Sequence, residues 1–239
     1  MEQLFTEAPE RSSDAATRPL DRSARAAITA LAQALDVFDP AAARRAALRA
    51  HLVDRIAVAA GALVQDRVDA ITGSLLAEIG ILLTHVRPVG TVDIVPDPSS
   101  AVLASNMLKS LPGLGSCANA VRHQHERWDG SGGPHALRGP EIPLSARLLA
   151  LAATLVGHPA SGSAPNWTAR RRRVDELLGS ALDPDLGAAA ALELESGDPL
   201  IAELNLSEVL NSLDRFVPIE RNSPVEALVS IGAAVRAAD

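Results

Sequence analysis

Apolar residues recur every three or four positions along most of the chain, which is the spacing of one face of an α-helix. The pattern predicts helices over Asp21–Phe38 and Pro40–Gly61. Asp21 or Ser23 can cap the first helix, and a proline at position 40 suits the first turn of the second. The predicted apolar stripe of the second helix consists of Leu48, Leu52, Ile56, Ala59 and Leu63.

The same spacing predicts further helices along the rest of the chain. They are Asp66–Leu83, Pro98–Leu111 (with Val102, Leu103, Met107 and Leu108 buried), a helix opening at Ser116, one from Ser145 to Ala153, Thr168–Leu178, Asp183–Leu194, Leu206–Phe216 and Pro224–Ala238. Segments 84–97 and 158–165 are expected to be loops because of their prolines and small residues, with 91–95 as a candidate for extended structure. No βαβ pattern occurs, so we expect an all-α bundle of about nine to eleven helices.

Two features interrupt this apolar pattern. Arg45 falls on the buried stripe of the second helix, one turn before Leu48, and a charge on a core face needs a partner. The segment 123–129 is rich in histidine and charge, and residues 130–134 read Gly-Ser-Gly-Gly-Pro. Three glycines and a proline exclude a helix interior there and predict a loop with close backbone approach.

Composition and charge narrow the possible classes of protein. Hydrophobic residues make up 47% of the chain, but aromatic residues only 2%, so the core must consist of Ala, Leu, Val and Ile, which favours helix. The net charge of −7 argues against a nucleic-acid partner. The single cysteine, Cys117, cannot form an intrachain disulfide and is expected to be structural.

The chain also carries no sign of a membrane segment. The most apolar window, Leu75–Leu83, is interrupted by Glu78 and is too short to span a bilayer, and the N-terminus does not resemble a signal peptide. We therefore expect a cytoplasmic protein. Its expected organisation is a flexible tail over residues 1–20, a helical domain over 21–195 and a C-terminal helical extension over 196–239.

The central motif resembles a known signature. Residues 125–134, HERWDGSGGP, and 137–153, LRGPEIPLSARLLALAA, are similar to the HD-GYP motif, which reads roughly HHERWDGSGYP followed by GLxGxxIPLxARIxAVAD. The similarity runs from about residue 28 to about residue 190, with LLAEIGI at 75–81 in place of the family's LLHDIGK. The resemblance implies an HD-type helical bundle and a bacterial metal-dependent phosphohydrolase, most often a phosphodiesterase for cyclic di-GMP.

The resemblance also implies where the family's histidines and aspartates would hold two or three iron or manganese ions. The matching positions here are Arg45, Ala77, Glu78, Ser100, Gln124, His125 and Ala153. Only His125 is retained, the family's lysine after the HD pair is Ile81, and the tyrosine of GYP is Gly133. We therefore expect no metal, no cofactor and no phosphodiesterase activity. We predict instead that Arg45 and Glu78 form a buried ion pair.

The remaining polar residues of the motif have two interpretations. A cluster of His123, His125, Glu126, Asp129 and His135 could bind a metal of its own, but helical spacing puts 123 and 125 on different faces. The preferred interpretation is that His125, Glu126, Arg127 and Asp129 hold the glycine loop through hydrogen bonds. The candidate pocket or loop residues are Glu126, Arg127, Asp129, Gly132, Gly133, Pro134 and Arg147. We expect Trp128 and Trp167 to be packing residues, and the run Arg170–Arg173 to be a solvated helix start with a phosphate-binding role left open.

Three functions follow from this pattern. The leading hypothesis is a catalytically inactive HD-GYP-like regulator that binds a protein partner or a cyclic dinucleotide. The second is an active phosphohydrolase whose iron or manganese site is repaired by residues such as Asp198 or Glu203. The third is a structural homo-oligomer, for example a homodimer, that uses residues 196–239 as its interface.

Overall fold

The computed structural model describes residues 20–79, 98–157, 166–195 and 204–217. These residues form helices without a β-strand, which confirms the all-α class. The helices are α1 (Arg22–Phe38), α2 (Pro40–Ala59), α3 (Val64–Leu76), α5 (Pro98–Lys109), α6 (Gly115–Arg122), η1 (Gly139–Glu141), α7 (Leu144–Val156), α8 (Trp167–Leu177), α9 (Pro184–Glu195), α10 (Leu206–Ser212) and η3 (Leu213–Phe216). Residues 1–19 of the predicted tail, the segments 84–97 and 158–165, and the helix over 224–238 lie outside the described residues. Leu20, the last residue of the predicted tail, is buried in the core, so the helical domain begins at least one residue earlier than predicted.

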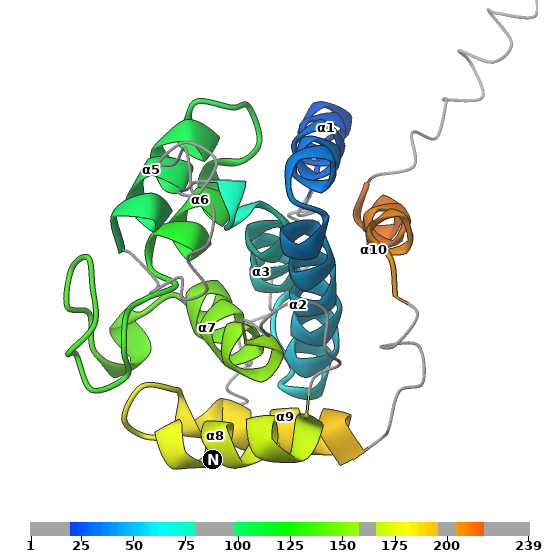
Figure 1. Ribbon diagram of the computed structural model, residues 1–239. Helices are drawn as coiled ribbons and strands as arrows, with labels where there is room; N and C mark the ends of the chain where they lie inside the picture. Colours follow the sequence, from blue (N-terminus) through cyan, green and yellow to red (C-terminus); the bar gives the residue numbers. More distant parts are fainter. Residues whose placement is uncertain (1–19, 80–97, 158–165, 196–203, 218–239) are drawn as a thin grey trace, which may run out of the picture.

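Helix α2 is the centre of the bundle. It packs against α1, α3, α7, α9 and α10, while α5 and α6 pack together and α6 leans on α3 and α7 (Figure 1). The main core cluster contains fully buried Leu52 and Ile56 of α2, Ile71 and Leu75 of α3, and Leu149 of α7. Because all of these side chains are aliphatic, the core is built from the residue types that the composition predicts.

The predicted boundary between the first two helices is confirmed by its hydrogen bonds. The Asp21 carboxylate accepts from Ala24 N at 2.7 Å, and Asp39 accepts from Ala42 N at 2.9 Å. Each aspartate therefore satisfies an N–H group that has no partner within its helix. Pro40 occupies the first turn of α2, where a missing N–H costs nothing.

The end of α2 differs from its predicted extent. The helix stops at Ala59, and Gly61 follows with φ of +66° in the left-handed region that favours glycine. The apolar stripe therefore ends at Ile56, and the expectation that Ala59 and Leu63 are buried is wrong. Leu63 is 73% exposed, and it instead precedes the first residue of α3, Val64.

The buried face of α5 is also rotated from the predicted one. Leu108 is buried as expected, but Leu103 is 43% exposed, and Val102 and Met107 are only partly buried. The buried positions are Ala101, Ala104, Ser105 and Leu108. Small side chains on this face let α5 pack closely against α6. This close packing, rather than the hydrophobicity of the larger residues, determines which face of α5 is buried.

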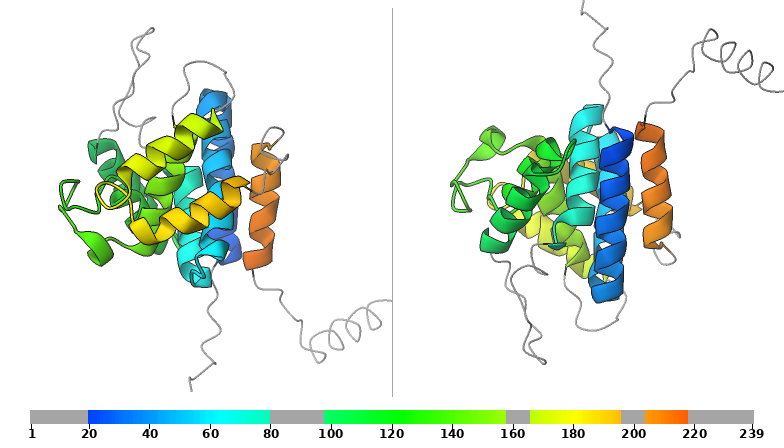
Figure 2. Two further views of the ribbon diagram at one scale, coloured as in Figure 1. Left: turned by 90° about the horizontal axis from the view of Figure 1, so that it is seen from below. Right: turned by 90° about the horizontal axis from the view of Figure 1, so that it is seen from above.

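Part of the C-terminal extension belongs to the core. Val209 and Leu210 of α10 and Leu213 and Phe216 of η3 are buried in the main cluster, and α10 lies along α2 (Figure 2). Asp54 of α2 pairs with both Arg67 and Arg215, which ties η3 to the bundle. Within the described part of the chain, every helix is too short or too polar to cross a bilayer.

Candidate functional site

Two of the former metal-ligand positions form an ion pair inside the bundle. Arg45 lies on α2, and Glu78 lies in the turn after α3, 33 residues away in sequence. Arg45 Nη2 donates to Glu78 Oε2 at 2.7 Å, and only 15% and 5% of the two side chains are exposed. The predicted buried pair is confirmed.

A second arginine, which was not predicted from the sequence, completes this cluster. Arg49 lies one helical turn after Arg45, and its Nη2 is 3.0 Å from the other carboxylate oxygen, Glu78 Oε1. The same Nη2 donates to the carbonyl of Ser74 at 3.2 Å. The signal available in sequence was the spacing of four residues between two arginines on one face of α2. We call Arg45, Glu78 and Arg49 the arginine–glutamate cluster.

The arginine–glutamate cluster carries a net positive charge in a buried place. Burial lowers the pKa of Arg49, Glu78 raises it and Arg45 lowers it, but a guanidinium does not lose its proton in proteins. The Nε atoms of Arg45 and Arg49 are buried and have no hydrogen-bond partner in the described part of the chain. One carboxylate therefore pairs with two guanidinium groups, and two Nε–H donors have no hydrogen-bond partner among the described residues.

This arrangement does not fit the metal centre that the HD-GYP resemblance implies. Both Glu78 oxygens lie against guanidinium groups, so the carboxylate has a cation at each side already. At the other positions stand Ala77, Ser100 of α5, Gln124 and His125 after α6, and Ala153 of α7. His125 is the only other one of these with a side chain typical of an iron or manganese ligand. The position of Ile81 and the candidate repair ligands Asp198 and Glu203 lie outside the described residues.

Glu126, Arg127 and Asp129, three of the four residues predicted to hold the loop after α6, do so through hydrogen bonds. The buried carboxylate of Glu126 accepts from His135 N at 2.7 Å and from Leu137 N at 3.0 Å. Arg127 Nε donates to Ser131 Oγ at 2.8 Å, and Asp129 accepts from the Ser131 hydroxyl at 2.5 Å. The Ser131 hydroxyl, the Arg127 guanidinium and the Ser131 N–H all donate to Asp129, and they hold the pKa of its carboxyl well below the usual range. The loop therefore has its own polar framework.

Within this loop, Gly132 packs against backbone. A Cβ atom at position 132 would meet Arg127 N, and would lie 2.6 Å from Glu126 Cα and from the carbonyl oxygen of His125. A Cβ atom on Gly133, at the family's tyrosine position, would meet nothing within 4 Å, and Pro134 after it is exposed. The two neighbouring glycines thus differ: one is required by close approach, and the other is not.

Arg147 at the start of α7 joins the loop to the neighbouring helices. It donates to Asp183 Oδ2 at 2.5 Å and to the carbonyl of Ile142 at 2.9 Å, and its guanidinium lies 5.7 Å from the Trp128 ring centre. The Asp183 side chain is almost completely buried. One guanidinium therefore fixes α7, the start of α9 and Trp128, which confirms that Trp128 packs the loop.

We expect Arg147→Lys to lower the free energy of unfolding by about 1–2 kcal/mol. An ammonium group can keep the Asp183 contact, but it cannot also reach the Ile142 carbonyl and lie over the Trp128 ring. Urea unfolding followed by tryptophan fluorescence measures the change. A variant with wild-type stability would show that the bond to Ile142 and the Trp128 contact contribute nothing.

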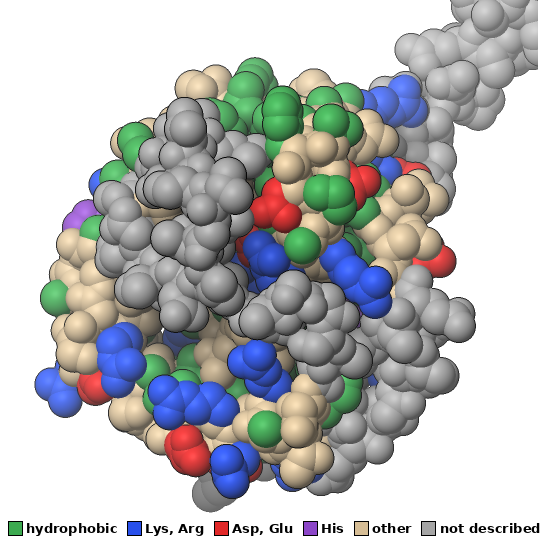
Figure 3. Space-filling model, in the orientation of Figure 1, with side chains coloured by type: hydrophobic (Ala, Val, Ile, Leu, Met, Phe, Trp, Pro, Cys, Tyr) green, Lys and Arg blue, Asp and Glu red, His purple; other side chains and the backbone are tan. Residues whose placement is uncertain are grey.

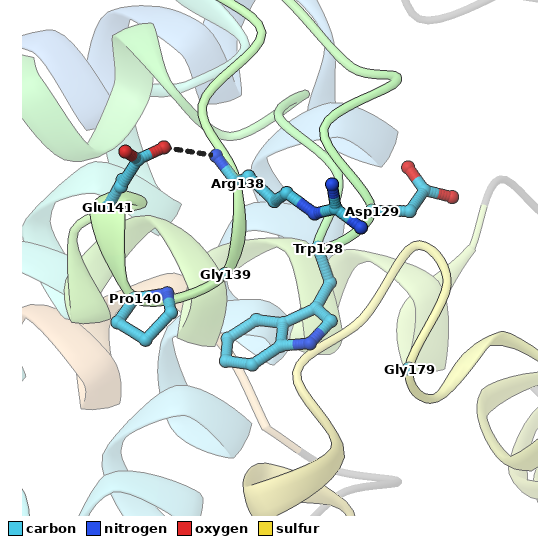
Figure 4. A pocket seen from close by; sticks show the side chains of 7 residues that line it. All are labelled: Trp128, Asp129, Arg138, Gly139, Pro140, Glu141 and Gly179. Carbon is cyan, nitrogen blue, oxygen red and sulfur yellow. Dashed lines mark hydrogen bonds between the residues drawn. The ribbon is translucent and has the colours of Figure 1, made fainter.

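A pocket of about 510 Å³ opens beside the loop. Trp128, Asp129, Arg138, Gly139, Pro140, Glu141 and Gly179 line it (Figure 4). Its lining carries charges of both signs, because it includes Arg138 together with Asp129 and Glu141. The Glu141 carboxylate accepts from Arg138 N at 2.9 Å. Of the predicted pocket residues only Asp129 lines this hollow; Arg147 lines a separate, much smaller one with Glu126 and Asp183.

Three other candidates have ordinary structural explanations. Burial raises the pKa of the Cys117 thiol to about 12, which fits the expected structural role. Trp167 packs against the core, as expected. In the run Arg170–Arg173, Arg172 and Arg173 are exposed and pair with Glu176, and basic side chains gather on the lower part of the face where α8 lies (Figure 3).

The polar cluster after α6 comes together only in part. His123, Glu126 and His135 lie close to one another, with potential ligand atoms within 4.8 Å. Burial lowers the pKa of His123, so its ring is neutral near pH 7. His125 and Asp129 are not part of this group, which agrees with the expectation that positions 123 and 125 face different ways.

Comparison with known proteins assigns this fold to a family. A model of the HD domain matches residues 20–173, more than half of the chain, so the protein belongs to the HD domain family. The loop signature and the 28-residue stretch shared with the first relative below support an HD-GYP-like member of that superfamily.

Two proteins of Vibrio cholerae are similar to it. A 28-residue stretch, 12% of this chain and 6% of the relative, is 71% identical to a probable cyclic di-GMP phosphodiesterase. The crystal structure of a cyclic GMP-AMP specific phosphodiesterase, V-cGAP3, superposes with a TM-score of 0.60 at 16% identity, over 81% of this chain and 54% of that one. The second match shows the fold alone, and this chain spans only part of the length of both.

Proposed function

We propose that this protein is a non-catalytic HD-GYP-like module that regulates bacterial signalling in the cytoplasm by binding rather than by hydrolysis. The arginine–glutamate cluster carries the proposal. In a metallophosphohydrolase, bound metal ions lower the pKa of a water molecule and hold the phosphate oxygens. Two guanidinium groups can neutralise negative charge, but they cannot bind and ionise a water molecule in the same way. The cluster therefore retains one part of the family's chemistry and lacks the other.

The loop after α6 supports a binding role. Its framework of Glu126, Arg127 and Asp129 is complete although the ligand positions around it have changed. A loop that is held by its own hydrogen bonds can present a constant surface to a protein partner at little entropic cost. A protein partner is the ligand that we propose first.

A cyclic dinucleotide is the second proposed ligand. Its phosphodiester groups are anionic, and the arginine–glutamate cluster has excess positive charge and two Nε donors without a partner in the described residues. Arginine forms forked hydrogen bonds with phosphate oxygens, which suits this ligand class.

The two alternative functions, an active phosphohydrolase and a homo-oligomer, each require particular residues. An active enzyme needs metal ligands from residues such as Asp198 and Glu203, which lie outside the described residues. A homo-oligomer built on residues 196–239 needs an exposed apolar face there. In the described part of that segment, Val209, Leu210, Leu213 and Phe216 are buried against their own chain, so these four side chains are not available to a second copy.

A hydrolysis assay tests the proposal. We expect the full chain to leave cyclic di-GMP and cyclic GMP-AMP intact in the presence of Mn²⁺ or Fe²⁺, with V-cGAP3 as the positive control for turnover of cyclic GMP-AMP. Turnover that depends on either metal would overturn it in favour of the remodelled enzyme. Calorimetric titration with cyclic di-GMP then distinguishes the two proposed ligands. Binding that weakens in Arg45→Ala supports the cyclic dinucleotide as the ligand. The absence of binding rules out cyclic di-GMP and favours a protein partner.

A further inference from the structure

Three potential metal ligands, none of them one of the seven former ligand positions, meet at the end of α6. His123 caps the C-terminus of α6, Glu126 follows in the next turn, and His135 comes back from the far side of the glycine loop. The bond from His135 N to Glu126 Oε1 at 2.7 Å brings the loop back, so the backbone itself positions the second histidine. His123 and Glu126 are buried, and His135 is exposed.

The ring of His123 is oriented as a metal ligand would be. Its Nδ1 lies 3.0 Å from the carbonyl oxygen of Asn119, which can only accept, so Nδ1 carries the proton. The lone pair is therefore on Nε2. A hydrogen bond from the second ring nitrogen to a backbone carbonyl is the usual support of a metal-bound histidine, because it sets the tautomer and the ring angle.

The second histidine faces that lone pair. His123 Nε2 and His135 Nδ1 lie 3.0 Å apart, as a hydrogen bond between the two rings. Two nitrogens on one tetrahedral zinc ion, at about 2.0–2.1 Å each, lie roughly 3.3 Å apart. The two nitrogens would therefore separate by a few tenths of an ångström and their rings would turn so that both lone pairs meet the ion. The Glu126 oxygen, which lies within 4.8 Å of the nitrogens, would approach further. Nε2 of the same exposed ring would then carry the proton that His135 Nδ1 donates in this bond.

Glu126 supplies a charge and an oxygen donor. Its two oxygens accept one backbone N–H each, at 2.7 and 3.0 Å, which leaves a further lone pair on each oxygen. A buried carboxylate with both backbone bonds in place is held as rigidly as a supported metal ligand. The donor set of two imidazole nitrogens and one carboxylate oxygen suits Zn²⁺ rather than Mg²⁺ or Ca²⁺, which prefer oxygen ligands throughout.

We propose that His123, Glu126 and His135 bind a single Zn²⁺ ion through His123 Nε2, His135 Nδ1 and one carboxylate oxygen of Glu126. The ion joins the end of α6 to the far side of the glycine loop. Two histidines and a glutamate leave a fourth position for water, as in zinc sites with three protein ligands. The site does not depend on the non-catalytic function proposed above, because it shares no residue with the former ligand positions.

Equilibrium dialysis of the full chain against Zn²⁺, with Co²⁺ titration followed by visible absorption, tests the site. We expect one ion per chain in the wild type and in the control His51→Ala, which removes a histidine of α2. His135→Ala is expected to weaken binding by about 100-fold or more, since loss of a mere hydrogen-bond partner of a ligand costs about 10–100-fold. Because His135 is exposed, this variant should fold, and circular dichroism checks that it does.

Further variants locate the ion. His123→Gln should weaken binding as His135→Ala does, whereas His125→Ala, at a former ligand position, should leave the affinity unchanged. The proposal is overturned by the absence of Zn²⁺ binding, by equal affinity in His135→Ala, or by a signal that is lost in His125→Ala alone. The last result would place the ion at the former metal centre.

Discussion

Glu78→Gln is expected to lower the free energy of unfolding by about 3–5 kcal/mol. The substitution keeps the size of the side chain and removes its charge. Arg45 and Arg49 would then be two buried cations, 15% and 6% exposed, without a counter-charge among the described residues around them. Their mutual repulsion adds to the cost of keeping each away from water. Urea unfolding near neutral pH, followed by circular dichroism, measures the change.

A matched control for this experiment lies on α8. Glu176 also contacts two arginines, Arg172 at 3.7 Å and Arg173 at 3.3 Å, but all three side chains are at least half exposed. Glu176→Gln should therefore change the stability by less than about 1 kcal/mol. If the two substitutions have equally small effects, burial does not amplify the Glu78 interactions and water must reach the arginine–glutamate cluster.

Gly132→Ala is expected to be the most disruptive single substitution in the glycine loop, with a loss of about 3 kcal/mol, at the upper end of the usual range for overpacking. The added methyl group would meet backbone atoms of residues 125–127, including Glu126 Cα at 2.6 Å. Backbone cannot rotate out of the way as a side chain can. The loop must open, which would also pull Glu126 from its two N–H donors.

The neighbouring residue provides the comparison. Gly133→Ala places its methyl group where nothing lies within 4 Å, so its effect should stay within about 0.5 kcal/mol. Thermal unfolding of both variants, together with the amide exchange of His135 and Leu137, reports stability and loop order. Equal stability of the two alanine variants would mean that the loop can shift as a body without cost.

The residues that could be predicted from the sequence are those whose partners follow from spacing along a motif. Position by position, the HD-GYP resemblance placed Arg45 and Glu78 at one centre, and opposite charge made them a pair. Arg49 could not be predicted in this way, because no metal ligand of the family stands at position 49. The four-residue spacing puts Arg49 on the same face of α2 as Arg45, but its contact with Glu78 follows from the packing of α2 on α3.

Other differences from the predictions have the same origin in packing. In α5 the apolar pattern favoured Leu103, but the approach of α6 selects the small face with Ala101 and Ala104. His135 was recognised as chemically suitable, yet its position beside His123 depends on how the glycine loop returns along Glu126. Local periodicity therefore predicts the helices well, whereas contacts made by a loop depend on a path that no short-range pattern specifies.

The arginine–glutamate cluster also has a consequence for how the protein meets its surroundings. The cations that balance Glu78 are arginine side chains of the same polypeptide. They do not dissociate on dilution, a chelator does not remove them, and peroxide does not change their charge. An iron-filled centre is exposed to all three. The counter-charges of Glu78 are therefore in place once the chain has folded, and they do not depend on the cell's supply of iron or manganese.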